Sequence, residues 1–397
     1  MKLNVAVFFG GESVEHEVSI ISAHQAIEAL DKSKYEAIPI YVSKDRRLFS
    51  DEAMKDIHYF TGKKLDTVIN ASTQVILVKE GNKVVLKPLK QKLLQGNHSQ
   101  TIDVALPVMH GTNGEDGTIQ GYLEMLKLPY VGCDIYGASV GQDKVLQKHI
   151  LHDNNLPITN WFWCYASDID TKKDEVLDKV HKLIYPVILK PSRTGSSVGI
   201  SVASNDEEYL AAFAEARQYD EKIITEKVVK PMREINCSVI GDGANSETSV
   251  LEEVNHSSDV DILDFKNKYQ GGSKKTSGAS KGMASTARIV PAPLEPYQTT
   301  QIEDLAKETF KVLGAAGVCR IDFIMDSETK TIYINEINTI PGSLAFYLWQ
   351  EKGVDFTSLL DKLIDIALER ERRREKMTFS YDTDLLETYQ GGSKGVK

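Results

Sequence analysis

Short apolar runs and amphipathic stretches follow one another along the first third of the chain. Residues 3–9 form an apolar run that stops at two glycines, and apolar positions recur at helical spacing over residues 18–30. A second apolar run covers residues 35–42. A strand, a glycine turn, a helix and a strand in this order predict an open parallel sheet of the α/β class.

Two further apolar segments extend the predicted N-terminal domain. Residues 75–87 are apolar on both sides of Gly81-Asn82, which predicts a hairpin, and residues 102–110 predict another buried strand. We expect this α/β domain to cover residues 1–141.

The chain from residue 142 to 376 has the pattern of two α+β domains, with a boundary near residue 227. A stretch rich in Gly, Ser and Lys at residues 270–287 is either a mobile insertion or a lid over a ligand. Residues 377–397 are expected to be a tail, preceded by a long amphipathic helix with a solvated basic end. The predicted helices lie at 143–153, 206–217 and 357–376, and the predicted strands at 187–190, 222–229, 234–240, 248–254, 318–325 and 331–336.

Composition narrows the classes of protein to which the chain can belong. With 41% hydrophobic and 26% charged residues, the 397-residue chain suits a globular protein of two or three domains. A net charge of −10 disfavours non-specific nucleic-acid binding, and no apolar run is long enough to cross a membrane. The four cysteines form no CxxC or Cys–His cluster, which argues against a zinc site and a disulfide framework. We therefore expect a cytoplasmic protein that acts on small molecules.

Two predicted strands near the C-terminal end carry paired polar residues. Arg320 and Asp322 share one face of the first strand, and Glu336 and Asn338 share one face of the second, because side chains alternate along a strand. Two carboxylates and an amide oxygen suit Mg²⁺ held together with nucleotide phosphates. The alternative is a salt-bridge ladder on a surface strand; the presence of both pairs favours the metal.

A second polar group follows the apolar strand that ends at Lys190. The Ser- and Gly-rich loop at residues 191–199 offers backbone N–H groups and hydroxyls to a phosphate, although the same composition is common in plain hairpins. The loop has neither the Walker nor the GxGxxG pattern. Farther on, the strand that contains Glu226 could present its edge to an adenine ring, with Glu226 at the base or Glu234 at the ribose.

Two polar loops are expected at the carboxyl edge of the N-terminal sheet, where ligands of α/β proteins bind. Residues 10–19 crowd three glutamates and a histidine around a strand-to-helix turn, and residues 110–117 begin with His110. Ser13 is predicted to cap the helix. Glu15 could bind a substrate amine, whereas a lone histidine such as His110 is more often structural.

Taken in this order, these motifs resemble the D-alanine–D-alanine ligase family of the ATP-grasp superfamily. The resemblance runs from Val5 to about Arg370 and depends on GGESVEHEVS, MHGTNGEDGTIQG, GQDKVLQK, ILKPSRTGSSVGIS, TEK, FKNKY, CRIDF and INEINTIPGSL. It implies an N-terminal α/β domain followed by two α+β domains that grasp ATP between them. It also implies that ATP phosphorylates the carboxylate of one D-alanine and that the amine of a second attacks the acyl phosphate, for peptidoglycan precursor synthesis.

The resemblance implies roles around the first amino acid and the nucleotide. Glu15 would anchor the amine of the first D-alanine, with Ser196 and Tyr269 beside it and His110 in the substrate site. Two Mg²⁺ ions, or Mn²⁺, would be held by Asp322, Glu336 and Asn338. ATP would be bound by Lys144, Lys190, Glu226, Lys227, Val229, Glu234 and Lys268.

The resemblance also implies an oxyanion site and a second-substrate site. Arg320 and the Gly342 N–H would bind the oxyanion of the tetrahedral intermediate, and Ser343 and Leu344 would hold the second amino acid. Here Ser343 follows Gly342 directly, about four residues sooner than is usual in the family. D-serine, D-lactate or another amino acid therefore remains an alternative second substrate, and a non-catalytic nucleotide sensor is an alternative of another class. A homodimer is possible.

Overall fold

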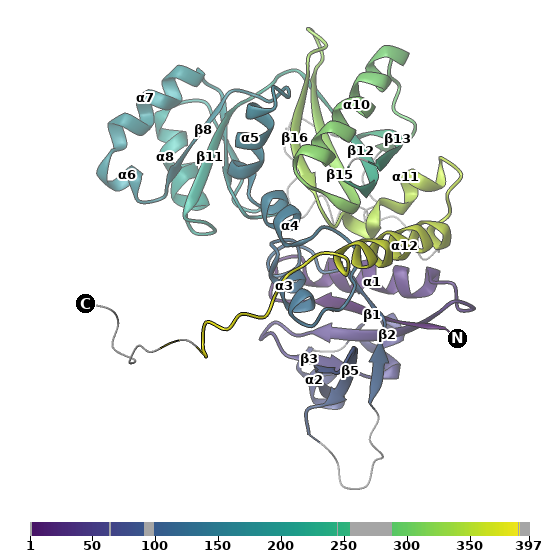
Figure 1. Ribbon diagram of the computed structural model, residues 1–397. Coiled ribbons are helices and arrows are strands. Elements are labelled where there is room, and N and C mark those ends of the chain that lie inside the picture. The colour runs from purple at the N-terminus through teal and green to yellow at the C-terminus, as the bar shows by residue number, and fades with distance from the viewer. Residues whose placement is uncertain are drawn as a thin grey trace.

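The computed structural model describes residues 2–62, 65–90, 99–243, 245–254, 288–387 and 389. Three sheets follow one another along the chain, and each belongs to a separate lobe in Figure 1. The predicted residues Lys268 and Tyr269 and the predicted insertion at 270–287 lie outside the described residues.

The N-terminal lobe is built on a seven-stranded sheet in the order β6-β5-β4-β3-β2-β1-β7. The predicted open α/β sheet is confirmed, but it is parallel only among β2, β1 and β7, and the other pairs are antiparallel. A two-residue turn joins β4 to β5 as the predicted hairpin, a connection that only antiparallel strands allow. The strands are β1 (Leu3–Gly10), β2 (Tyr35–Val42), β3 (Leu48–Ser50), β4 (Thr73–Glu80), β5 (Lys83–Pro88), β6 (Gln100–Ile102) and β7 (Val104–Pro107).

The helices of this lobe lie between and after the strands. Helix α1 follows β1 as predicted, and its buried face packs on the sheet. The helical elements are α1 (His16–Ala29), η1 (Glu52–Lys55), η2 (Ile57–Tyr59), α2 (Leu65–Ala71), α3 (Thr118–Met125) and α4 (Ile135–Gln142).

The central lobe is a four-stranded antiparallel sheet, in the order β10-β9-β11-β8, with helices packed against it. Its apolar core includes Val180, Leu189, Phe213 and Ile223, which are all buried. Its elements are α5 (Lys144–Asp153), β8 (Trp161–Tyr165), α6 (Asp168–Thr171), α7 (Lys173–Leu183), β9 (Val187–Pro191), β10 (Ser201–Ala203), α8 (Asp206–Ala216) and β11 (Lys222–Lys227).

The C-terminal lobe is a five-stranded antiparallel sheet in the order β14-β13-β12-β15-β16. One face packs on α10 through residues such as Ile235 and Phe310. Because side chains alternate along a strand, Glu234 and Asn236 lie on the opposite face. The elements are β12 (Met232–Asp242), β13 (Asn245–Val254), β14 (Arg288–Ile289), α10 (Pro296–Val312), β15 (Ala316–Asp326), β16 (Ile332–Asn338), η4 (Gly342–Ala345), α11 (Phe346–Gln350) and α12 (Phe356–Arg374).

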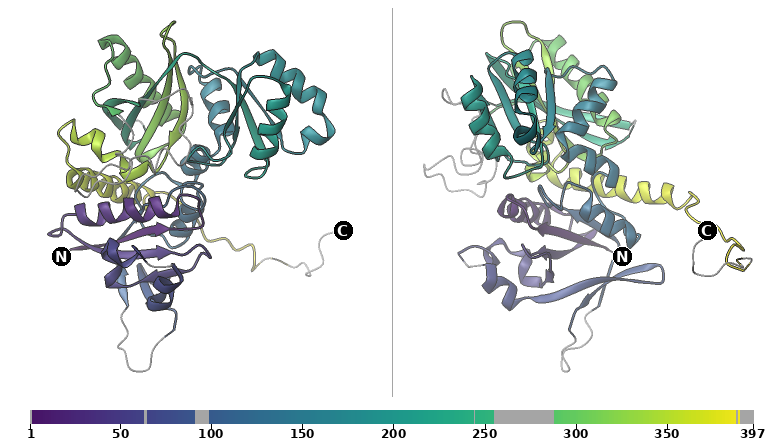
Figure 2. Two further views of the ribbon diagram at one scale, coloured as in Figure 1. Left: turned by 180° about the vertical axis from the view of Figure 1, so that it is seen from behind. Right: turned by 90° about the vertical axis from the view of Figure 1, so that its left-hand side faces the viewer.

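Helix α12 joins the C-terminal and N-terminal lobes. Its buried residues Leu359 and Leu363 belong to one apolar cluster with Val5 of β1, and Figure 1 and Figure 2 show α12 lying between the two sheets. Its basic end is exposed to solvent at Arg372, Arg373 and Lys376, as predicted. Two other arginines of this end are anchored, since Arg374 donates to Glu124 at 2.6 and 2.9 Å and Arg370 donates to backbone oxygens. None of the helices in the described part of the chain combines the length and apolar character needed to span a lipid bilayer.

A buried carboxylate also joins these two lobes. Glu115 accepts the backbone N–H of Gly111 at 2.8 Å and, from the C-terminal lobe, the N–H of Ile340 at 2.8 Å and the hydroxyl of Thr339 at 3.3 Å. Burial, together with the negative charge of Glu15, raises the pKa of Glu115 to about 7, although these hydrogen bonds oppose the shift. The contact between the lobes is therefore sensitive to pH near neutrality.

The raised pKa predicts how stability depends on pH. Between the ordinary carboxyl value of 4.5 and about 7, the folded protein keeps a proton that the unfolded chain has lost, so the free energy of unfolding falls as pH rises. For a shift of this size the fall is at most about 3 kcal/mol. Glu115→Gln should remove it, so the stability of the wild type relative to this variant should decrease from pH 4.5 to 7.5 in denaturant titrations.

A matched control is Glu124→Gln. The guanidinium of Arg374 lowers the pKa of Glu124 below its ordinary value of 4.5. The contribution of this carboxylate to the free energy of unfolding is therefore complete above that pH and is lost only in more acidic solution. The stability difference for this variant should stay constant from pH 5 to 7.5. Equal pH profiles for wild type and Glu115→Gln would contradict the assignment.

Candidate active site

One pocket brings together predicted residues from all three lobes. The loops after β1 and β7, the loop after β9, and the strands β12, β15 and β16 all contribute to its lining. The predicted residues that line it are Glu15, His110, Lys144, Ser196, Glu234, Arg320, Glu336, Asn338 and Gly342. The predicted residues absent from this lining are Lys190, Glu226, Lys227, Val229, Asp322, Ser343 and Leu344.

Glu15 joins the N-terminal lobe to the central lobe at this pocket. It occupies the N-cap position of α1, and its carboxylate accepts a hydrogen bond from the hydroxyl of Ser196. The prediction that Ser13 caps the helix is wrong, because the helix begins later and the Ser13 hydroxyl instead accepts the backbone N–H of Glu15 at 3.1 Å. A Cβ atom at Gly195 would lie 2.8 Å from Glu15 Oε2, so a side chain there would displace this carboxylate from its present position.

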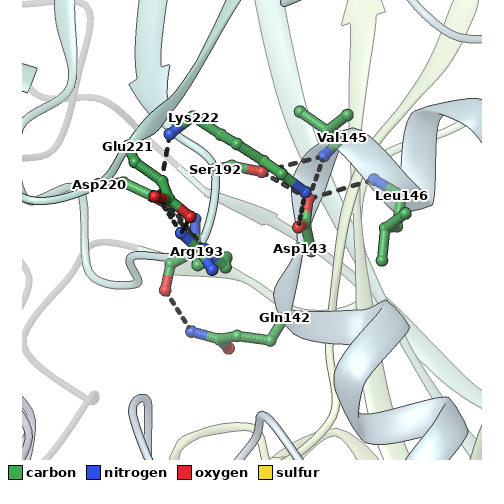
Figure 3. Close-up of polar contacts among 9 residues, drawn as sticks. All are labelled: Gln142, Asp143, Val145, Leu146, Ser192, Arg193, Asp220, Glu221 and Lys222. Atoms are coloured by element: carbon green, nitrogen blue, oxygen red, sulfur yellow. Dashed lines mark hydrogen bonds and ion pairs between the residues drawn. The ribbon is translucent and has the colours of Figure 1, made fainter. Parts of the chain in front are cut away.

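Asp143 fastens the loop after β9 to the start of α5 (Figure 3). Its Oδ1 accepts the Ser192 hydroxyl at 2.6 Å and the N–H groups of Val145 and Leu146, while Oδ2 lies 2.9 Å from Lys222 Nζ. Burial alone would raise the pKa of Asp143, but these hydrogen bonds hold it below its ordinary value. This network fixes Lys144 beside the Ser- and Gly-rich loop.

Two lysines predicted to bind phosphate are held by acidic and carbonyl partners. Lys144 Nζ lies 3.3 Å from Glu336 Oε2 and donates to the Thr194 carbonyl at 2.9 Å. Lys190 Nζ lies 2.8 Å from Glu226 Oε1 and donates to Asn335 Oδ1 at 3.0 Å. Both lysines therefore link the central lobe to strand β16 of the C-terminal lobe, Lys144 through Glu336 and Lys190 through Asn335. Lys190 also pairs with Glu226, a buried carboxylate of the central lobe.

The side chain of Glu226 lies between two lysines. Besides Lys190, Lys148 Nζ lies 2.7 Å from Glu226 Oε2, and the Thr159 hydroxyl donates to the same oxygen at 2.7 Å. Burial would raise the pKa of Glu226, but the two cations outweigh this effect and hold it well below the ordinary range. Lys148 was not predicted, although its position one helical turn after Lys144 is a usable signal.

The paired strands β15 and β16 place the predicted metal ligands side by side. Asp322 lies opposite Glu336 in the register, and Arg320 lies opposite Asn338. Both oxygens of Asp322 accept from Arg320, at 2.6 and 2.7 Å, and Asn338 Nδ2 donates to Oδ2 at 3.0 Å. Burial and the neighbouring charge of Glu336 raise the pKa of Asp322 despite Arg320.

This donor set fits a magnesium ion. Burial and, to a smaller extent, the neighbouring carboxylates raise the pKa of Asp322, and a divalent cation would offset both effects. Carboxylate and amide oxygens are also the ligands that Mg²⁺ prefers. Within the described ranges, no group of three or more His, Cys, Asp or Glu side chains is arranged to hold a metal. The remaining ligands would therefore be phosphate oxygens and water.

His110 links the N-terminal lobe to the turn after β16. Its Nδ1 lies 2.8 Å from the Ile340 carbonyl and its Nε2 lies 3.0 Å from the Ser22 hydroxyl, which also accepts the N–H of Ser343 at 3.1 Å. Burial lowers the pKa of His110, so the ring is neutral, with Nδ1–H donating to the carbonyl. The histidine thus holds this turn in place at the pocket wall.

The turn itself has an unusual backbone. Ser343, Leu344 and Ala345 have φ values of 53°, 52° and 51°, a left-handed conformation that costs about 1–2 kcal/mol per residue. Leu344 is buried in the apolar cluster that contains α12. A second-substrate role for Ser343 and Leu344 stays a prediction, and the apolar environment of Leu344 leaves only its backbone for such a role.

Sequence reasoning also missed charged and polar residues of the pocket lining. Glu115, Asn236 and Arg288 also line it. Asn236 follows Glu234 at strand spacing, which is a signal for the same face of β12. Arg288 had no local signal, because it stands alone after a long polar stretch.

Comparisons with known proteins agree with this geometry. Residues 4–133 match the family model described as D-ala D-ala ligase N-terminus, and residues 150–365 match D-ala D-ala ligase C-terminus. The chain is 38% identical to the D-alanine–D-alanine ligase of Thermosipho africanus, covering 97% of this chain and 98% of the relative. It is 36% identical to that of Natranaerobius thermophilus, covering 94% and 97%.

Solved structures show the same likeness. The D-alanine-D-alanine ligase from Coxiella burnetii superposes with a TM-score of 0.76 and 27% identity, covering 94% of this chain and 96% of that one. The VanG D-Ala:D-Ser ligase from Enterococcus faecalis superposes with a TM-score of 0.74 and 25% identity, covering 92% and 100%. Family models over most of the chain, near-full-length relatives and the shared three-lobed fold lead to one conclusion: the chain belongs to the D-alanine–D-alanine ligase family.

Proposed function

We propose that this protein joins two D-alanines in an ATP-dependent reaction that passes through an acyl phosphate. The observation that carries the proposal is that one pocket is lined by Glu15, Ser196, Arg320, Glu336 and Asn338. An amine anchor, a hydroxyl, an arginine and metal-binding oxygens are the groups that such a reaction needs. The names of the curated relatives support D-alanine as the substrate.

In the first step, Glu15 binds the ammonium group of the first D-alanine and Ser196 orients it. A carboxylate oxygen attacks the γ-phosphorus of ATP, so that a new O–P bond forms and the bond to ADP breaks. Both reactants are anions, and Lys144 and Lys190 reduce their repulsion. The ion pairs that hold these lysines before substrate binds keep them in position.

Asp322, Glu336 and Asn338 would hold Mg²⁺, as two ions, with Mn²⁺ as a possible substitute. When bound, the metal neutralises charge on the β- and γ-phosphates. Arg320 is kept close to this site by its two hydrogen bonds to Asp322.

In the second step, the amine of the second amino acid attacks the carbonyl carbon of the acyl phosphate. Arg320 and the N–H of Gly342 stabilise the oxyanion of the tetrahedral intermediate, and phosphate leaves with one of the original carboxylate oxygens. We assign the adenine and ribose to Glu226, Lys227, Val229 and Glu234. Lys268 and Tyr269, outside the described residues, keep the roles that the resemblance implies.

The wider context of the reaction is also a proposal. Each sheet falls within one of the proposed domains, 1–141, 142–227 and 228–376, which supports this division. ATP as co-substrate favours a cytoplasmic location and a role in peptidoglycan precursor synthesis. The net charge of −10 supports the absence of a nucleic-acid partner, and a homodimer stays a prediction.

One observation keeps a second candidate substrate open. The turn at Ser343–Ala345 lies where the family binds its second amino acid, and a structural neighbour is named as a D-Ala:D-Ser ligase. The same chemistry with D-serine as the acceptor is therefore the second candidate. A pure nucleotide sensor is disfavoured, because it has no need of Arg320 beside the metal-binding carboxylates.

The proposal predicts phosphate release that depends on D-alanine. Purified protein with ATP and Mg²⁺ should release phosphate only when D-alanine is added, and mass spectrometry should find D-alanyl-D-alanine in equal amount. L-alanine is the matched control and should release little. Release without any amino acid, or none with any D-amino acid, would contradict the ligase.

Replacing a metal ligand tests the site itself. Glu336→Gln keeps the size of the side chain, and Glu336 is more exposed than Asp322. Replacing Asp322 instead would leave the buried guanidinium of Arg320 without its carboxylate partner, which would also destabilise the fold. We expect this variant to need at least about tenfold more Mg²⁺ for half-maximal turnover, because one anionic ligand is lost. The midpoint of thermal unfolding should change little.

Asp326→Asn, at the end of the same strand β15 and outside the pocket, is the control for Glu336→Gln. It should leave the Mg²⁺ dependence unchanged. An unchanged Mg²⁺ requirement in Glu336→Gln would rule this carboxylate out as a ligand.

A further inference from the structure

Three anionic groups meet in the pocket during the proposed reaction: the carboxyl group of the first amino acid, the transferred phosphoryl group and the carboxylate of the second amino acid. Among the described lining residues there are also three lysine or arginine side chains, Lys144, Arg288 and Arg320. Lys144 is assigned to the phosphates and Arg320 to the oxyanion. Arg288 has no role in the reaction as described so far.

Arg288 is held in one orientation by buried partners. Its Nη1 donates to Glu252 Oε2 at 3.1 Å and to the Tyr347 hydroxyl at 2.5 Å, and that hydroxyl donates to Glu252 Oε1 at 2.9 Å. The guanidinium carbon also lies 5.0 Å from the centre of the Tyr347 ring. Glu252 is fully buried, so the arginine is pre-positioned rather than free to turn into solvent.

Two buried polar atoms beside these partners have nothing to bond to within the described part of the chain. They are Arg288 Nε, a donor, and Asn236 Oδ1, an acceptor. Asn236 is only 3% exposed, and its amide nitrogen donates to Glu252 Oε1 at 3.1 Å. Buried polar groups are costly when unpaired, so such a pair at a pocket wall marks a place where a ligand supplies the partners.

The position of these groups relative to the reaction is fixed by strand register. Asn236 on β12 lies opposite Asp322 on β15, and Asp322 binds Arg320. Arg288 and Asn236 bond the two oxygens of the same Glu252 carboxylate, so they flank one small region next to the oxyanion arginine. A second amino acid bound in this region would lie next to the arginine assigned to the oxyanion that forms when its amine attacks.

We propose that Arg288 binds the carboxylate of the second amino acid and that Asn236 Oδ1 accepts a hydrogen bond from its attacking amine. The described contacts of the guanidinium use Nη1, which leaves the Nε edge for a carboxylate. The donor and the acceptor thus match the two charged ends of a zwitterion. This inference rests on the proposed ligase function and names the feature that selects its acceptor: a free carboxylate.

The turn after Gly342 leads to the residue that orients Arg288. Leu344 points into the apolar core, and the left-handed turn at Ser343–Ala345 leads directly into α11, which carries Tyr347 to Glu252 and Arg288.

A competition between two acceptors tests this role. The wild-type protein is given ATP, Mg²⁺, D-alanine and an equal concentration of D-alaninamide, which lacks the carboxylate and so can serve only as acceptor. Mass spectrometry then measures the ratio of D-alanyl-D-alanine to D-alanyl-D-alaninamide. We expect the wild type to favour D-alanine and Arg288→Gln to lower this ratio at least about tenfold, the size of a lost charge-assisted hydrogen bond.

Control variants separate this role from a structural one. Arg233→Gln removes an arginine of the same sheet that pairs with Glu253 at 2.6 and 2.7 Å and does not line the pocket, so the ratio should stay at the wild-type value. Arg288→Lys keeps the charge and should restore part of the preference. If Arg288→Gln fails to fold, Tyr347→Phe takes its place. This variant removes the hydrogen bond from Arg288 to the Tyr347 hydroxyl but keeps the ion pair between Arg288 and Glu252. It should lower the product ratio by a smaller factor than Arg288→Gln.

The possible results are distinct. A wild-type ratio in folded Arg288→Gln, or in Tyr347→Phe where the first variant does not fold, would overturn the role of Arg288 and leave the ligase function standing. A wild-type protein that forms neither product would overturn the ligase function and this inference with it.

Discussion

Charged and polar side chains from three separate lobes are held close together where the lobes meet, and the arrangement of the lobes depends on these contacts. Glu15 contacts Ser196 and Lys144 contacts Glu336 at the pocket, and Lys190 contacts Asn335 outside its lining, so each contact joins two lobes. An isolated buried charge is strongly unfavourable, whereas a paired and hydrogen-bonded one is tolerated. The pairing thus stabilises the pocket in the form that substrates will enter.

The same pairing prepares the chemistry. Lysines and arginines that must later oppose negative charge on phosphate are already fixed by carboxylates, as Glu226 fixes Lys190 and Asp322 fixes Arg320. Groups held in place before the reaction do not have to reorganise during it, which is the main source of electrostatic catalysis. The network around Asp143 extends this order to the loop that carries Ser196 (Figure 3).

Local periodicity accounts for most of what the sequence could predict. The two polar pairs of β15 and β16 share one face because side chains alternate along a strand, and the helices α1, α5, α8 and α12 follow their apolar spacing. The predicted cap at Ser13 was wrong because the exact start of a helix depends on contacts that spacing does not record. The N-terminal sheet was predicted to be parallel, but only β2, β1 and β7 pair in parallel. The apolar pattern of a strand does not record its direction, which depends on the connections between strands.

What the sequence could not predict depends on contacts between distant segments. Glu226 was expected at the nucleotide, and only the fold shows that its side chain lies between Lys148 and Lys190. Arg288 and Tyr347 are 59 residues apart and meet only because both approach Glu252 on β13. No local pattern records such a meeting, so these residues had to be found in the structure.

The central claim is that the pocket transfers the terminal phosphoryl group of ATP to a carboxylate before an amine attacks. The most direct measurement uses D-alanine labelled with ¹⁸O in its carboxyl group, in ordinary water, with mass analysis of the phosphate released. Transfer through an acyl phosphate predicts one ¹⁸O in each phosphate, because the oxygen that attacked phosphorus leaves with it. Dipeptide formed together with unlabelled phosphate would contradict the account.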